Sequence, residues 1–307
     1  MFFSKPEPQS AVTPHNIAFL GTDALGLYWA DILKNLGHRV FFLCPPRYAD
    51  EYNATDFIYK DTARLKNPRN NFCFGHELPF APDLLLITVS PERRKSNLTL
   101  LSPSALADTL IVSFCFPDQD AVLPEIVHKP VINAFFEGWI NRSKNHISIY
   151  GHSPRVTFSL PDTSNEAAFL REIFEPAGIT TVFSEQENNN LWNFAGPFLA
   201  HGLLTVCFGR SIFELAKNEE GRRQIDVLLE EISRLAEADN VCLPAAGLLA
   251  RLYEIPSAYV SPLQKSVQTH NPLFFERLNS FLLSKNARND KKYPHIHRFM
   301  REVYNKY

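Results

Sequence analysis

The sequence lacks the cysteine spacings that bind metal ions or form disulfide frameworks. Its five cysteines lie far apart, and no two of them are arranged as C-x-x-C. An odd, scattered set of cysteines is typical of reduced thiols in a cytosolic protein. The histidines His270, His295 and His297 include no i, i+4 pair and have no cysteine partner, so we expect no metal site there.

The sequence also lacks an excess of charge and long apolar runs. Lysine and arginine number 31 against 33 acidic residues, for a net charge of −2. This balance gives no basic field for nucleic acid and no acidic excess of the kind found in disordered chains. No run approaches the roughly 18 apolar residues of a membrane span, and no apolar signal-peptide core precedes Pro6. We therefore predict a soluble, cytoplasmic protein that binds neither nucleic acid nor membranes.

What the sequence does contain is an alternation of strands and helices in its first half. With 307 residues, of which 45% are hydrophobic, the chain is long enough for two domains. Nearly continuous apolar runs, typical of strands covered on both faces, predict strands at residues 17–20, 38–43, 83–89, 109–114 and 131–135. A helix is expected at residues 24–36. Strands that alternate with helices favour an α/β fold with a doubly wound, mostly parallel sheet.

The second half changes character after a strand at 155–160 and a helix at 165–175. Long amphipathic patterns then predict helices at residues 191–215, 222–238, 271–283 and 295–304. We therefore expect a short N-terminal extension (residues 1–15), an α/β domain (16–185) and an all-helical domain (186–307).

The turn between the first strand and the first helix is the most informative segment. Gly21 and Gly26 occupy the outer positions of the pattern G-x-G-x-x-G, in which a dinucleotide pyrophosphate rests on a helix N-terminus. Asp23 takes the place of the middle glycine, which normally lets the backbone approach the pyrophosphate. Asp23 therefore either disfavours phosphate, or caps the following helix, or does both.

Other residues allow two interpretations each. Arg47 follows the second strand, where an arginine can bind the 2′-phosphate of NADP, but it could equally be a loop residue in solvent. His201 could act as a general acid while Asn193 positions a carbonyl group, or it could be a packing histidine. Three polar residues after the last parallel strand are candidates for lining a ligand site: Asn133, Glu137 and Arg142.

Taken together, these features resemble ketopantoate reductase (2-dehydropantoate 2-reductase), of the superfamily that includes 6-phosphogluconate dehydrogenase. The resemblance spans about residues 16–304. It rests on the turn at 21–26, the run at 83–89, the pair Glu137-Gly138 before a hairpin-like segment, and Leu191-Trp192, which is similar to the family motif LWxK. It implies NADPH-dependent reduction of a 2-oxo acid, in which a lysine protonates the developing alkoxide, and a helical domain that often forms dimers.

The residues that this resemblance would make catalytic are mostly replaced. The LWxK lysine falls at Asn193 or Phe194, depending on a one-residue choice of register. The asparagine four residues later falls at Pro197 or Phe198. Asparagine can form a hydrogen bond to an oxygen but cannot supply a proton at neutral pH.

Further replacements occur along the chain. The lysine that closes the third strand falls at Ser90, and an Asn-Gly pair falls at Phe116-Pro117. A late serine maps near Ser261, whereas a glutamate about a dozen residues beyond it falls at or near Phe274. We therefore expect that the reaction is not carried out by the usual residues.

From these observations we predict an NADP-dependent oxidoreductase acting on a 2-oxo acid or a related carbonyl compound. The alternative is a protein on the same fold that transfers no hydride and binds a ligand or partner instead; an opine-dehydrogenase-like enzyme is a third interpretation. The substrate would be a small carboxylate, and a homodimer through the helical domain is possible on the resemblance. The candidate catalytic residues are Asn193, His201 and Ser261. The candidate cofactor-binding residues are Gly21, Thr22, Asp23, Ala24, Leu25, Gly26, Arg47 and Ser90.

Overall fold

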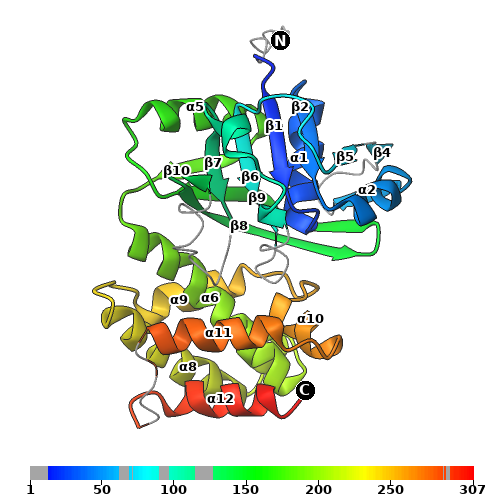
Figure 1. The fold of residues 1–307 in the computed structure, drawn as a ribbon. Coiled ribbons are helices and arrows are strands. Elements are labelled where there is room, and N and C mark those ends of the chain that lie inside the picture. Colours follow the sequence, from blue (N-terminus) through cyan, green and yellow to red (C-terminus); the bar gives the residue numbers. More distant parts are fainter. Residues whose placement is uncertain are drawn as a thin grey trace, which may run out of the picture.

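The computed structural model describes residues 13–61, 69–70, 72–89, 97–114, 127–285, 287 and 291–307. An α/β domain and a helical domain lie one above the other, with the described N-terminal residues at the far end of the sheet domain and the C-terminus in the helical domain (Figure 1). The expected domain boundary near residue 185 falls between the last strand, β10 (Thr180–Phe183), and the first helix of the helical domain, α6 (Glu187–Phe208).

Ten strands of the described chain join in one sheet, in the order β4-β3-β9-β8-β7-β6-β1-β2-β5, with β10 paired to β9. The strands before β10 are β1 (Asn16–Leu20), β2 (Arg39–Leu43), β3 (Phe57–Asp61), β4 (Arg69–Asn70), β5 (Cys73–Gly75), β6 (Leu84–Ile87), β7 (Leu110–Ser113), β8 (Ile132–Ser143) and β9 (His146–Phe158). Neighbours are parallel except for β8–β9 and β3–β4. The predicted α/β fold class with a mostly parallel sheet is confirmed.

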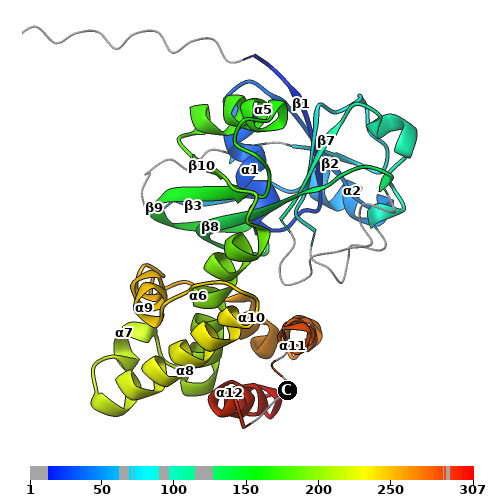
Figure 2. The same ribbon diagram turned by 90° about the vertical axis from the view of Figure 1, so that its left-hand side faces the viewer.

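The core of the sheet is buried on both faces, which explains the continuous apolar runs. In β1, Ile17 and Phe19 belong to one hydrophobic cluster, and Ala18 and Leu20 belong to the cluster on the opposite face. The first cluster includes buried residues of α1 (Ala24–Asn35) and α5 (Asn165–Phe174). Figure 2 shows α1 and α5 lying against this face of the sheet.

A long antiparallel hairpin formed by β8 and β9 extends the sheet beyond the strands that the sequence predicted. The expected strands at 131–135 and 155–160 cover only the ends of these two strands that are farthest from the hairpin turn. Most of β8 is of intermediate exposure, because one side of the hairpin faces the helical domain rather than a sheet-covering helix. This partial burial weakens the apolar pattern along the strand.

The helical domain is built around α6. Its other helices are α7 (Ile212–Leu215), α8 (Glu219–Glu237), α9 (Ala245–Tyr253), α10 (Pro262–Gln268), α11 (Leu273–Ser284) and α12 (Pro294–Tyr304). The single helix predicted at 191–215 is divided, since Gly209 adopts a left-handed conformation (φ +63°) and Ser211 begins α7 with a capping box.

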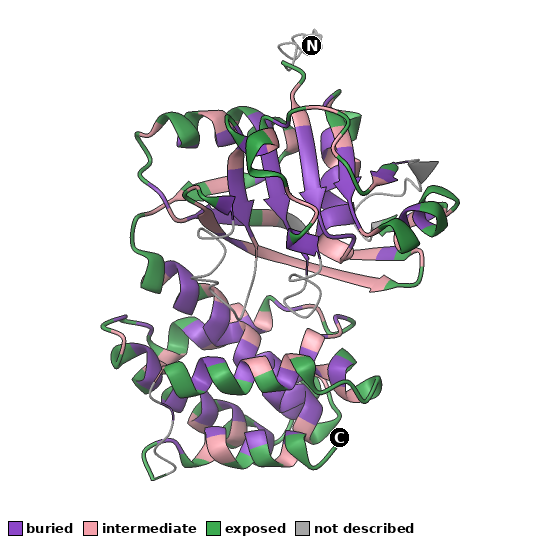
Figure 3. Cartoon of the chain, viewed as in Figure 1, coloured by how far each residue is buried: buried purple, intermediate pink, exposed green. Residues whose placement is uncertain are grey.

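Among the described helices, α6 alone is long and apolar enough to span a membrane, with a mean hydropathy of 1.3. However, 72% of that apolar window is buried inside the protein. Figure 3 shows α6 enclosed by other helices, and α8, α9, α10 and α12 all pack against it. The apolar character of α6 is therefore explained by its position at the centre of the domain.

Close backbone packing explains both glycines of the β1–α1 turn. Gly21 has φ of +117°, and a Cβ atom there would lie 2.5 Å from the backbone nitrogen of Val89. A Cβ atom on Gly26 would lie 2.5 Å from the hydroxyl oxygen of Thr88 and 2.9 Å from the carbonyl oxygen of Gly21. The two glycines therefore let α1 start close against the end of β6, whether or not a ligand is bound.

We predict that Gly26→Ala lowers the free energy of unfolding by about 1–3 kcal/mol, because the methyl group overpacks this contact. The matched control is Gly247→Ala in α9, where Gly247 is exposed and the nearest contact of a new Cβ is 3.7 Å away. That substitution should stabilise the protein by about 0.5–1 kcal/mol through helix propensity. Urea denaturation of both variants would test this, and equal effects would contradict the packing argument.

Candidate functional site

A cleft of about 590 Å³ lies between the two domains, at the carboxyl ends of β1, β6 and β7. Thr22 follows β1, Thr88 and Val89 follow β6, and Phe114 follows β7; all four line the cleft. The opposite wall comes from β8, α6 and α10. Open α/β sheets bind ligands at this edge, so we regard the cleft as the candidate functional site.

Asp23 is the N-cap of α1. Its Oδ1 atom accepts a hydrogen bond of 3.0 Å from the backbone N–H of Gly26, while its backbone carbonyl accepts from Leu27. The capping interpretation of this residue is thus confirmed. The carboxylate lines the cleft and occupies one of the helix N–H groups that would otherwise face a phosphate.

Arg142 brings a positive charge to the same turn from the far strand β8. Its guanidinium group donates a hydrogen bond to the carbonyl oxygen of Thr22. It also lies over the rings of Tyr52 and Phe57, with distances of 5.5 and 5.4 Å to their centroids. Of the three residues predicted to line a ligand site, Asn133, Glu137 and Arg142, it is Arg142 that lines the cleft.

The cleft wall opposite the turn is aromatic. The ring of Phe194 stacks on Phe198, 5.6 Å apart, and lies 5.8 Å from Phe135. Phe198 in turn meets Phe274 of α11 edge-on at 6.4 Å. The sequence left two registers open, Asn193 with Pro197 or Phe194 with Phe198, for the LWxK lysine and the asparagine four residues later. The pair that lines this cleft is Phe194 and Phe198. We call Phe135, Phe194, Phe198 and Phe274 the phenylalanine wall.

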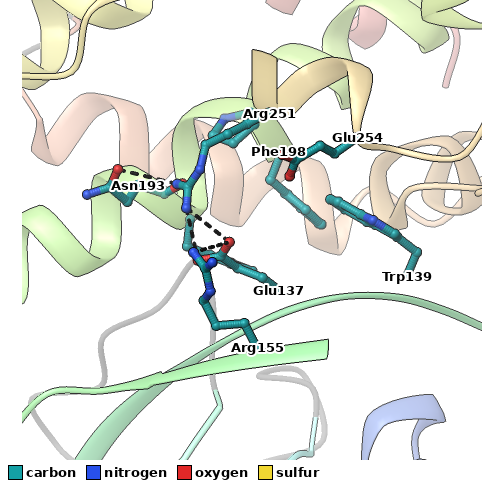
Figure 4. Close-up of a pocket in the computed structure, with 9 residues that line it drawn as sticks. Glu137, Trp139, Arg155, Asn193, Phe198, Arg251 and Glu254 are labelled. Atoms are coloured by element: carbon teal, nitrogen blue, oxygen red, sulfur yellow. Dashed lines mark hydrogen bonds and ion pairs between the residues drawn. The ribbon is translucent and has the colours of Figure 1, made fainter. Parts of the chain in front are cut away.

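Asn193, the predicted catalytic residue, lies outside the cleft and lines a smaller pocket of about 170 Å³ on the adjacent face of α6 (Figure 4). Its side-chain amide donates to the carbonyl oxygen of Asn189. In the same pocket, Arg251 of α9 binds both oxygens of Glu137 at 3.1 and 3.0 Å, and Arg155 lies 3.9 Å from that carboxylate. Arg251 thereby joins the helical domain to β8.

A proline inside α6 explains the other contact of Arg251. Pro197 has no N–H group, so the carbonyl oxygen of Asn193, four residues earlier, loses its helical partner. The guanidinium group of Arg251 donates to this carbonyl oxygen and also, at 3.3 Å, to the Asn193 side chain. One arginine therefore satisfies both the interrupted helix and a carboxylate of the other domain.

A second pocket beside the turn continues the cleft toward the end of β2. It shares Thr22, Asp23 and Val89 with the cleft and adds Arg47 and Tyr48 at the start of α2 (Pro46–Asn53). Arg47 is exposed, and its guanidinium carbon lies 4.7 Å from the centroid of the Tyr48 ring. The structure thus places the predicted residues 21–23 and Arg47 around one connected surface.

The remaining catalytic candidates are not brought to the cleft. Ser261 is completely buried, and its hydroxyl and amide form a capping box with Gln264 at the start of α10. His201 is 4% exposed and lines a different cavity in the helical domain. Burial lowers the pKa of His201 to about 4, so the imidazole is neutral near pH 7. The placement of Ser261 supports a structural role for this residue. His201 does not line the cleft, so it has no role there.

Several sequence expectations lie outside the described residues, namely those on Ser90, Phe116 and Pro117. Of the polar candidates on β8, Asn133 binds the Glu187 carboxylate at the start of α6, and Glu137 binds Arg251. Among the described residues, no group of three or more histidine, cysteine or acidic side chains could hold a metal ion.

Sequence reasoning missed Arg251 and Lys265. Lys265 lines the cleft from α10, and its ammonium group donates to the carbonyl oxygen of Arg142 at 3.0 Å. Together with Arg142 and Lys144 it gives the described cleft lining three cations against one acid, Asp23. Neither missed residue belongs to a local motif, and only the fold brings them to the domain boundary.

Neither the known family models nor the curated protein sequences match this chain. Solved structures do match. A 2-dehydropantoate 2-reductase from Geobacter metallireducens aligns with a TM-score of 0.78 at 15% identity, over 95% of this chain and 100% of that one. A dimeric ketopantoate reductase from Staphylococcus aureus gives 0.75 at 15% identity, over 95% and 98%. A D-mandelate dehydrogenase with NADH and anilino(oxo)acetate gives 0.76 at 16% identity, over 95% and 98%. The fold of this chain is therefore that of the ketopantoate reductases, as the sequence resemblance predicted.

We predict that Arg251→Met lowers the free energy of unfolding by about 1–3 kcal/mol, because the Asn193 carbonyl and the Glu137 carboxylate both lose a donor. In a Pro197→Ala background the loss should shrink by about 1 kcal/mol, since the introduced alanine restores an N–H donor to that carbonyl. Thermal and urea unfolding of the four proteins would measure this coupling.

The matched control is Arg155→Met, which removes an arginine 3.9 Å from the same carboxylate but with a half-exposed side chain (49%). It should change stability by no more than about 0.5 kcal/mol. Additive effects of Arg251→Met and Pro197→Ala would show that the arginine does not compensate for the proline.

Proposed function

We propose that this protein is an NADP-dependent oxidoreductase that reduces the carbonyl group of a small 2-oxo acid with an apolar side chain. The observation that carries the proposal is the connected surface from Arg47, past the turn at residues 21–26, into a cleft with a cationic side and a phenylalanine wall. The ketopantoate reductase fold supports it, because its solved examples include reductases and a dehydrogenase with NADH.

A dinucleotide would need a tight glycine turn, a partner for its 2′-phosphate and a site for its pyrophosphate, and the residues present fit the first two. The glycines at 21 and 26 allow a tight turn at the carboxyl end of β1. Arg47, at the end of β2, is suited to the 2′-phosphate that distinguishes NADP from NAD, and Cys44 leaves no acid there for the ribose of NAD. At the pyrophosphate position Asp23 opposes binding, whereas the Arg142 guanidinium beside Thr22 offsets its charge.

The opposite side of the cleft is suited to the substrate. Arg142, Lys144 and Lys265 supply positive charge for a carboxylate, and the phenylalanine wall supplies apolar surface for a side chain. A polar or very small 2-oxo acid would leave the wall facing water. We therefore infer a substrate with a branched or aromatic side chain.

Reduction needs a hydride and a proton. The reduced nicotinamide, when bound, supplies the hydride to the carbonyl carbon. The proton must reach the carbonyl oxygen from a side chain that is protonated near neutral pH. Burial raises the pKa of Tyr259, which makes its phenol a weaker acid than usual. We assign the proton to the Nζ group of Lys265, which then regains a proton from water.

A second candidate function is ligand binding without hydride transfer. It is favoured by Phe194, Phe198 and Phe274, which stand where the family resemblance expects polar residues. Dimer formation through the helical domain would suit either function. The dimeric ketopantoate reductase from Staphylococcus aureus supports that assembly as a proposal for this chain.

The first test is turnover. NADPH oxidation should be measured with pyruvate, 3-methyl-2-oxobutanoate and phenylpyruvate, and we expect kcat/KM to rise at least about tenfold from the smallest to the apolar substrates, since each buried methylene contributes about 1 kcal/mol or more. Lys265→Met should lower kcat by about 10²-fold or more, the usual contribution of a general acid. Lys144→Met, at the hairpin turn, should mainly raise KM. Nucleotide binding without turnover of any 2-oxo acid would favour the second function.

The second test is nucleotide affinity. Saturation at 100 times Kd should stabilise the fold by roughly 2.7 kcal/mol. Arg47→Gln should weaken NADPH binding about tenfold and leave NADH nearly unchanged, whereas Asp23→Asn, which keeps a capping oxygen without the charge, should tighten both.

The matched control for Arg47→Gln is Arg223→Gln on α8, whose side chain is 74% exposed and lines none of the pockets described here. If neither nucleotide shifts the unfolding temperature at millimolar concentration, the redox function is excluded. If Arg47→Gln weakens both nucleotides equally, Arg47 does not recognise the 2′-phosphate.

A further inference from the structure

Another cavity, of about 340 Å³, lies within the helical domain. Its walls come from α6, the segment between α6 and α7, the loop after α9, and α10, and Lys306 lies at its edge. Among its described lining residues, Tyr259 is the one that also lines the interdomain cleft. The cavity is therefore distinct from the site considered above.

His201 is a buried residue of the lining of this cavity. It is 4% exposed, and its Nδ1 atom has no hydrogen-bond partner in the described part of the chain. A buried nitrogen without a partner is unfavourable, so such a group needs an explanation beyond packing. The sequence allowed a packing histidine whose hydrogen bonds are satisfied, and the unpartnered Nδ1 does not fit that description.

The rest of the lining combines buried side chains with exposed polar and cationic ones. Thr205, Val206, Ile212 and Ile255 are buried, and the Thr205 hydroxyl is already bonded to the carbonyl oxygen of His201. Arg210 and Lys306 are exposed at the rim. The described lining contains no acidic residue.

The nearest acid on the same segment is Glu214, which caps α7. Its carboxylate accepts hydrogen bonds from the amide and the hydroxyl of Ser211, and these bonds lower the pKa of Glu214. Glu214 does not line the cavity. An anion in the cavity would therefore meet Arg210 and Lys306 without a carboxylate among the lining residues.

We propose that this cavity binds a small organic carboxylate, whose charge is attracted by Arg210 and Lys306 and whose body reaches the His201 ring. Its volume of about 340 Å³ falls in the size range of small-molecule sites. The site is separate from the proposed nucleotide and substrate cleft, so it stands or fails independently of the proposed function.

The test follows the His201 ring by NMR in protein labelled at its histidine side chains, with His201→Phe used to assign the signal among the ten histidines. The probes are hexanoate and benzoate, and the neutral controls are hexanamide and benzamide. We expect both acids to shift the His201 signal to saturation, and both amides to bind at least about tenfold more weakly, because they lack the charge that the rim attracts.

Arg210→Gln combined with Lys306→Gln should weaken acid binding at least about tenfold, and both side chains are exposed, so folding should be unaffected. The matched control, Lys60→Gln with Arg223→Gln, removes two exposed cations that line neither cavity and should leave the affinity unchanged. Lys144→Gln, in the interdomain cleft, should also leave it unchanged.

Four results would overturn the proposal. The His201 signal could fail to move with either acid. The amides could bind as tightly as the acids, or the rim variant could bind like the unaltered protein. Finally, Lys144→Gln could abolish the shift, which would mean that the acids bind in the interdomain cleft and reach His201 only through Tyr259.

Discussion

The rotational setting of α6 about its own axis is the constraint on which the interdomain cleft, the pocket of Arg251 and the cavity of the helical domain depend. On one side, the buried indole of Trp192 donates a hydrogen bond of 2.8 Å to the Asp239 carboxylate, which also pairs with Lys285 at 2.6 Å. On another side, Arg251 holds the carbonyl oxygen that the proline of the helix leaves without a donor. Both contacts are directional, so they resist rotation in a way that apolar packing alone does not. Charge-assisted bonds to a half-buried arginine add to that resistance.

This setting decides the chemistry of three cavities at once. Adjacent residues of a helix point about 100° apart, since a turn contains about 3.6 residues. Phe194 and Phe198 line both the interdomain cleft and the pocket of Arg251, whereas Asn193 and Pro197 line that pocket and not the cleft. His201 follows Phe194 by seven residues, so it lies on nearly the same face of α6 but about 10 Å farther along the axis, in the cavity of the helical domain. A shift of one residue would bring an amide into the cleft in place of a ring. The one-residue ambiguity in the sequence was thus an ambiguity between a polar and an aromatic site, and only the tertiary contacts of α6 resolve it.

The features that could be predicted from the sequence are those that nearby residues of the chain determine. The strands buried on both faces, such as β6 (Leu84–Ile87), have continuous apolar runs, and the turn with Gly21 and Gly26 has a local sequence pattern, although the contacts that require its glycines come from Thr88 and Val89 after β6. In the long hairpin of β8 and β9, the apolar pattern predicted strands only at the ends, because the middle is half-buried and has no regular alternation. The hairpin-like segment at 147–157 was indicated by the family resemblance alone. Arg251 and Lys265 could not be predicted at all. Each reaches its partner on β8 from a helix more than a hundred residues later in the chain.

The departures from the reductase pattern do not carry equal weight. Asp23 satisfies a helix N–H group, so the fold alone accounts for it, with or without a ligand. The phenylalanine wall has no such local reason, because Phe194, Phe198 and Phe274 are only half-buried and line a cleft. Apolar rings that meet across a cavity remain partly hydrated unless something covers them, and contiguous surface of this kind marks binding sites. The wall is therefore the stronger support for the proposed substrate, which carries an apolar group beside the cations of β8 and α10.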